Sequence, residues 1–131
     1  MIKFTLEIKP RTKKNHGQII HSKTGKHILL PSKPYREFEK EAVKQITNLF
    51  GNIEPIDFRC NVKCVFYKDT HCRSDLPGYM QAILDAMVKA ELLKDDNSEI
   101  VYSTDGSYVD YDKKNPRIEI EIEALDKTDV F

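Results

Sequence analysis

The chain has 131 residues, of which 40% are hydrophobic and 32% are charged. This composition excludes a long disordered chain, and the length suits one domain with its own core. No apolar run is long enough to cross a bilayer and the N-terminus lacks a signal-peptide pattern, so we expect a cytoplasmic protein with no membrane partner.

The net charge of zero conceals a division along the chain. Residues 1–50 carry 11 lysines and arginines against 4 acidic residues, a charge of +7, whereas residues 51–131 carry 10 against 17, a charge of −7. A basic segment on a neutral protein favours contact with a polyanion such as nucleic acid. The alternative is a solvated basic surface that is balanced by the acidic half.

The first third of the chain predicts a strand, a loop and a hairpin. Residues 2–9 alternate between apolar and polar side chains, which is typical of a half-buried strand. Residues 11–17 are basic and polar and indicate a loop. Residues 18–21 and 27–30 then flank a short polar segment, which is typical of an irregular hairpin.

A helix is predicted over residues 33–50. Ser32 can cap it and Pro34 suits its first turn. Apolar residues recur at helical spacing, namely Tyr35, Phe38, Ala42, Ile46 and Leu49. Residues 56–67 alternate again and predict a long strand.

The second half predicts another helix over residues 76–92 and a turn at residues 95–97. Short strands are expected at 99–103 and 107–112, and strict alternation predicts a strand at 117–123. We therefore expect an α/β fold of the α+β kind, with a single mixed sheet and two helices packed on one of its faces. This single domain would span residues 1–125, followed by a tail at 126–131.

The cysteines and glycines of the chain argue against a zinc site and a nucleotide cofactor. Three cysteines cannot all pair, so free thiols are expected. Cys60 and Cys64 suggest zinc together with His71 and Cys72, but four residues of a strand span about 13 Å, too far for one ion. No glycine-rich loop that would hold phosphates is present, so we expect no nucleotide cofactor.

Four carboxylates surround the second predicted helix. Asp75 precedes it, Asp85 lies inside it, and Asp95 and Asp96 follow it. Clustered carboxylates are the ligands that Mg²⁺ or Mn²⁺ prefers. A straight helix would separate Asp75 from Asp96 by about 30 Å, so the two can meet only if the helix is shorter or the chain returns antiparallel to it. The alternatives are an N-terminal cap for Asp75, a helical pair of Asp85 with Lys89, and turn chemistry for Asp95 and Asp96.

The block from Arg73 to Asp96 resembles the RusA family of Holliday-junction resolvases, the crossover junction endodeoxyribonucleases. That family has an Asp-Leu-Asp-Asn opening, a helical Lys, a central Asp-Ala-Leu and a final Asp-Asp. The spacings agree, with ten residues from Asp75 to Asp85 and twenty-one from Asp75 to Asp96. Lys14-Asn15-His16 and Tyr35-Arg36 extend the likeness, which covers residues 2–123.

The resemblance implies a homodimeric, Mg²⁺-dependent endonuclease, with Mn²⁺ as an alternative metal, that nicks four-way DNA junctions in recombination and repair. Asp75 and Asp96 fall on metal-ligating positions of the family, and Asp95 lies beside them, so the resemblance implies that these three are the catalytic residues and ligands of the metal. Asp85 matches a family acid and would either bind the metal or orient a ligand. Residues that could contact DNA are Lys13, Lys14, Asn15, Lys23, Lys26 and Arg73.

Three departures from the family pattern fall inside the site. Pro77 stands where the family has its second Asp, Gly78 where it has the following Asn, and Gln81 where it has the helical Lys. Proline cannot coordinate a metal, and glutamine cannot neutralise charge. A neighbouring group could substitute, the candidates being Lys68, His71, Arg73 and Lys94. The alternative is a weakened or inactive homologue that binds junctions without cutting them.

Overall fold

The computed structural model describes residues 1–12, 18–21, 25, 27–30 and 32–125. The elements are β1 (Ile2–Leu6), β2 (Gln18–His21), β3 (His27–Leu30), α1 (Lys33–Phe50), β4 (Cys60–Lys68), α2 (Leu76–Lys89), β5 (Val101–Ser103), β6 (Tyr108–Tyr111) and β7 (Arg117–Ala124). None of the helices in this described part of the chain is long and apolar enough to cross a membrane.

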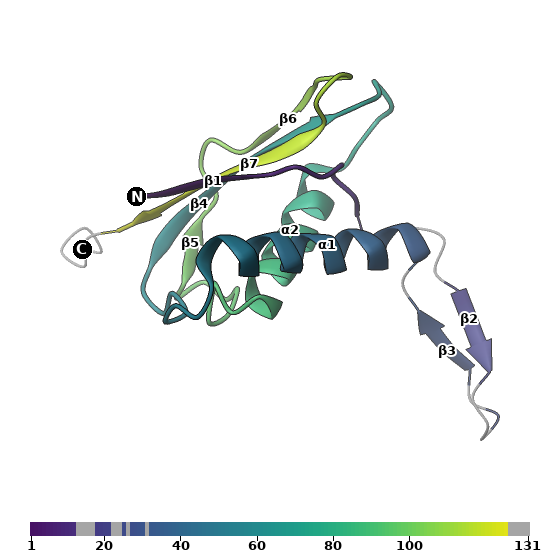
Figure 1. The fold of residues 1–131 in the computed structure, drawn as a ribbon, viewed down its shortest axis with the longest axis horizontal. Helices are drawn as coiled ribbons and strands as arrows, with labels where there is room; N and C mark the ends of the chain where they lie inside the picture. Colours follow the sequence, from purple (N-terminus) through teal and green to yellow (C-terminus); the bar gives the residue numbers. More distant parts are fainter. Residues whose placement is uncertain (13–17, 22–24, 26, 31, 126–131) are drawn as a thin grey trace.

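Five strands form one mixed sheet. β7 lies between β1 and β4 and is antiparallel to both, whereas β5 and β6 pair in parallel with successive parts of the other edge of β4. Both helices lie on the same side of this sheet, and the β2–β3 hairpin extends away from it (Figure 1). The predicted fold, a mixed sheet with two helices, is confirmed.

The core lies between the sheet and the two helices. Alternation along β7 buries Ile118, Ile120 and Ile122, and β4 buries Cys60, Val62, Cys64 and Phe66 on the same side. The three cysteines are free, as expected, and Cys72 is exposed. From α1, the apolar positions predicted at Tyr35, Phe38, Ala42 and Ile46 are buried, whereas Leu49 in the last turn is exposed.

Several strands are shorter than their alternating patterns. β1 ends at Leu6 because the amide of Ile8 donates to the carbonyl of Leu6 and bends the chain. β4 begins at Cys60 rather than at residue 56. Ile56 instead forms a single bridge with Leu93, which lies after the second helix.

The end of α2 also differs from the prediction. The helix ends at Lys89, not at residue 92, and Glu91 adopts a left-handed conformation with φ of 61°. The amides of Leu92 and Leu93 both donate to the carbonyl of Met87, at 2.9 and 3.3 Å. This closure is a Schellman-type end with a glutamate where glycine is usual.

The chain then runs back beside the helix. Leu92 and Leu93 are each 1% exposed. The backbone amide of Ile56 donates to the carbonyl of Leu92 at 2.9 Å, and the backbone amide of Lys94 donates to the carbonyl of Ile56 at 3.0 Å. We call residues 92–96 the return segment. Its buried leucines and its backbone bonds to Ile56 hold it in place, and it carries Asp95 and Asp96.

Replacing Glu91 with glycine should stabilise the protein. A side chain costs energy in the left-handed region and glycine does not, so the free energy of unfolding should rise by about 0.5–1 kcal/mol. Urea denaturation measures this change.

Glu54→Gly is the matched control, because Glu54 is exposed and does not have a positive φ. It should leave stability unchanged or lower it, since glycine adds freedom to the unfolded chain. If Glu91→Gly behaves like the control, the strain assigned to Glu91 is absent.

Candidate active site

Gln81 joins two of the predicted carboxylates. Its Nε2 donates to Oδ1 of Asp85 at 2.9 Å and lies 3.5 Å from Oδ2 of Asp96. Gln81 and Asp85 are four residues apart on α2 and so share a face of the helix. The return segment brings Asp96 to that face. We call Asp75, Asp85 and Asp96, together with Gln81, the acidic strip.

Asp75 occupies the N-cap position of α2, but its side chain makes no capping hydrogen bond. A β-carbon added to Gly78 would lie 3.3 Å from Oδ2 of Asp75 and 3.2 Å from Cγ2 of Thr12. Gly78 therefore leaves room for the half-buried carboxylate at the first turn of the helix. This turn leads directly to Gln81.

Asp95 is engaged in the turn at the end of the return segment. Its Oδ1 accepts from the backbone amide of Asp96 at 2.8 Å, and its Oδ2 accepts from the side-chain amide of Asn97 at 2.9 Å. These bonds, the backbone bond foremost, lower the pKa of the exposed Asp95 carboxyl. Asp95 thus shapes the turn that presents Asp96.

The acidic strip offers the chemistry of a hard divalent cation, because its ligands are carboxylate oxygens. Ten helical residues place Asp75 and Asp85 about 15 Å apart along the axis, so these two cannot share one ion. Within the described residues, no group of three or more His, Cys, Asp or Glu side chains is arranged to hold a metal. Asp75 and Asp85 therefore occupy separate positions along the strip.

Lys89 does not pair with Asp85 as the helical spacing would allow. Its ammonium instead bonds Oε1 of Glu39 on α1. Oε2 of Glu39 accepts from the hydroxyl of Tyr35 at 3.0 Å. This cluster beside the acidic strip was not predicted from the sequence. Its only sequence signal is the four-residue spacing of Tyr35 and Glu39, which is common on helices.

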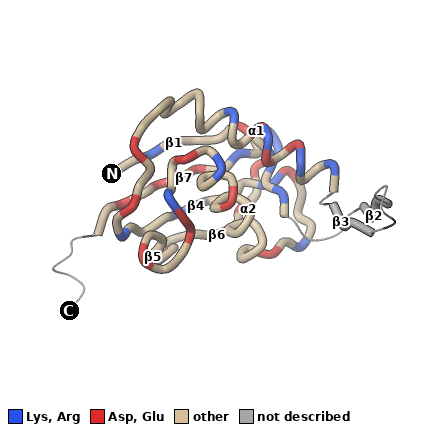
Figure 2. The backbone as a smooth tube through the Cα atoms, turned by 90° about the horizontal axis from the view of Figure 1, so that it is seen from below, with Lys and Arg blue, Asp and Glu red and all other residues tan. Residues whose placement is uncertain are grey.

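The candidate DNA contacts are only partly described. Lys13, Lys14, Asn15, Lys23 and Lys26 lie outside the described residues. Arg73 is exposed in the loop that leads from β4 to Asp75. Acidic and basic residues are interspersed along α1 (Figure 2).

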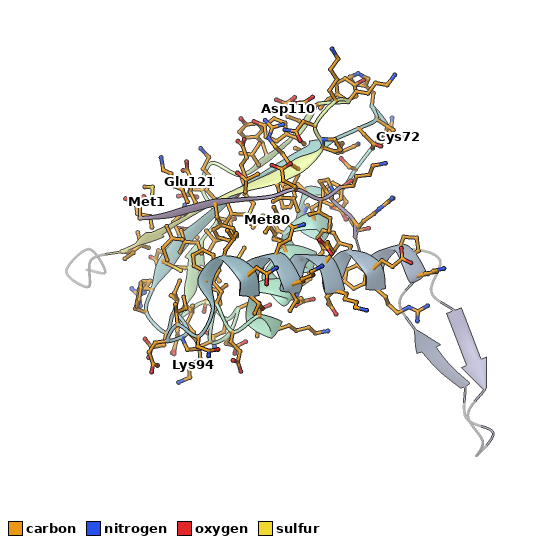
Figure 3. The ribbon with its side chains drawn as sticks, in the orientation of Figure 1. Met1, Cys72, Met80, Lys94, Asp110 and Glu121 are labelled. Atoms are coloured by element: carbon orange, nitrogen blue, oxygen red, sulfur yellow. The ribbon has the colours of Figure 1, made fainter. Side chains whose placement is uncertain are left out.

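The neighbouring groups that could replace the family Lys lie in different places. The ammonium of Lys68 bonds the carbonyl of Cys72, and His71 stacks on Tyr111 with ring centroids 3.6 Å apart. In Figure 3, Cys72 lies at the upper right and Lys94 at the lower left, far from it in this view. These candidates therefore do not gather around one point.

A family model described as "Endodeoxyribonuclease RusA" matches residues 7–123, which is nearly the whole chain. A search of curated proteins finds no match.

Asp95 should make stability depend on pH. A lowered pKa means that the carboxylate contributes stability above its unfolded pKa of about 3.9, and that this contribution is lost as pH falls through the folded pKa. Asp95→Ala should thus be less stable than the wild type at pH 5–7, and the difference should shrink below about pH 4. Thermal unfolding across pH measures it.

Asp57→Ala serves as the control, because Asp57 is exposed and lies outside this turn. A stability difference for Asp95→Ala that stays constant down to pH 2 would argue against the turn bonds as its cause.

Proposed function

The chain belongs to the endodeoxyribonuclease RusA family, which acts on branched DNA junctions, and we propose that it is a divalent-metal-dependent nuclease that nicks four-way junctions. The metal would be Mg²⁺, with Mn²⁺ as an alternative. The observation that carries this proposal is the return of the chain after α2, which joins Asp96 to Asp85 through Gln81.

The proposed roles follow from position. Asp75 and Asp96 would hold the cation, with Asp95 fixing the turn that carries Asp96. Asp85 would orient Asp96 through the amide of Gln81. When bound, a divalent cation lowers the pKa of its water and neutralises charge at a phosphate. The chain's own residues hold the carboxylates in place and, through Gly78, leave space beside Asp75.

The substrate contacts and the assembly are proposed from the resemblance and the charge distribution. Arg73 leads directly into Asp75, so its guanidinium would contact phosphates beside the scissile bond. Lys13, Lys14, Asn15, Lys23 and Lys26 would add contacts from the basic half of the chain. A homodimer would present two equivalent sites to a four-way junction, whose arms have matching two-fold symmetry.

The nuclease proposal is tested on a synthetic four-way junction. The wild type should nick it with Mg²⁺ or Mn²⁺, and Asp75→Asn or Asp96→Asn should slow nicking by about a hundredfold or more, because an amide is a weaker metal ligand. Single-turnover rates on labelled junctions measure this.

Asp57→Asn is the control for the same chemical change at an exposed aspartate outside the strip. It should nick like the wild type. Equal rates in the wild type and in both site variants would reject the site assignment.

A second candidate function is a junction-binding homologue that does not cut. It is favoured by Pro77 at the start of α2 and by Gln81, which contributes an amide where the family has a cation. Such a protein would still bind junctions through its basic residues, and its affinity would fall steeply with salt.

This second function predicts tight, salt-dependent junction binding with no nicking under either metal. The double variant Pro77→Asp and Gln81→Lys, which restores the family's second Asp and its helical Lys, should then gain nicking. Mobility shifts at several salt concentrations and nicking assays on the same samples measure both. Robust nicking by the wild type would exclude this function.

A further inference from the structure

Lys89 lies on α2 next to the acidic strip, but its ammonium pairs with a glutamate of α1 and not with the strip. Lys89 follows Asp85 by four residues on α2, and an acid that precedes a lysine by four residues is the favourable order for a helical ion pair. Yet the Lys89 ammonium bonds Oε1 of Glu39 on α1.

Glu39 is well fixed for this contact. Its side chain is 17% exposed, whereas that of Lys89 is 58% exposed. The hydroxyl of Tyr35, a residue only 2% exposed, donates to Oε2 of Glu39 at 3.0 Å. One oxygen is thus held by a buried donor, which leaves the other directed at Lys89.

Asp85 lies within the electrostatic reach of the same cluster. Burial foremost, and then the charges of Glu39 and of Asp85, raise the pKa of Tyr35, so its hydroxyl stays protonated as a donor. The side chains of Tyr35, Glu39 and Asp85 are therefore close enough to interact electrostatically across the α1–α2 contact. If Lys89 were released from Glu39, its ammonium could pair with Asp85, four residues before it on α2.

Pairing of Lys89 with Asp85 would change the acidic strip in two ways. The ammonium would compete with Gln81 Nε2 for Oδ1 of Asp85, which loosens the bridge to Asp96. It would also add a positive charge beside carboxylates that must attract a cation.

We propose that Glu39 is a positioning residue that holds Lys89 away from Asp85, so that the acidic strip keeps the charge and the Gln81 bridge needed to bind a divalent cation. This inference rests on the proposed function, because it assigns Glu39 a role in metal binding by the same site. Nothing in the resemblance to the family assigns a role to Glu39 or Lys89.

Calorimetric titration of the full chain with Mn²⁺ tests the proposal without relying on activity. Glu39→Gln should weaken Mn²⁺ binding by about threefold to tenfold, because Lys89 is released toward Asp85. Adding Lys89→Met should restore wild-type affinity, since methionine keeps the helix propensity and packing but carries no charge. Lys89→Met alone should bind like the wild type.

Glu37→Gln is the matched control, because Glu37 lies on the same helix and pairs with Lys33 instead. It should bind Mn²⁺ like the wild type. Restored binding in the double variant also shows that Glu39→Gln has not simply unfolded the chain.

The outcomes separate the two proposals. Wild-type affinity in Glu39→Gln, or equal weakening in Glu39→Gln, Lys89→Met and the double variant, would overturn the role of Glu39 while leaving the nuclease proposal standing. A wild-type chain that binds no Mn²⁺ but is folded would overturn both.

Discussion

The return of the chain after α2 is the constraint on which the candidate site depends. Asp96 follows the helix, yet its carboxylate lies 3.5 Å from Gln81, eight residues before the end of the helix at Lys89. Two buried leucines and the backbone of Ile56 fix that return. The buried leucines and these backbone bonds therefore bring the acids together, against the repulsion between like charges.

The two helices divide the charged groups between structural and site roles. Glu39, Lys89 and Tyr35 form a cluster across the α1–α2 contact, while Gln81, Asp85 and Asp96 form the acidic strip beside it. The two clusters differ in the donor that each acid receives. Glu39 pairs with the charged Lys89, whereas Asp85 and Asp96 receive the neutral side-chain amide of Gln81.

The sequence predicted the fold from periodicity alone. Alternation located β1, β4 and β7, and helical spacing located both helices, because these patterns arise directly from burying one face. The end of α2 could not be predicted in this way. Leu92 and Leu93 continue the apolar pattern of the helix, but they belong to the return segment. The backbone of Ile56, which is distant in sequence, holds them there through hydrogen bonds. The meeting of Asp96 with Gln81 was thus beyond sequence reasoning, although the acids themselves were identified.

Gln81 stands where the family pattern has a lysine. Its contacts show that the substitution keeps a hydrogen-bond donor at this position and loses a positive charge. A glutamine amide donates two hydrogens, so it can bridge two carboxylates much as an ammonium would. It carries no charge, so it does not itself offset the repulsion between Asp85 and Asp96. The buried return segment then maintains the position of Asp96 beside Gln81. The same bridge explains the role that we propose for Glu39: a Lys89 ammonium on Asp85 would compete with the Gln81 amide that joins Asp85 to Asp96.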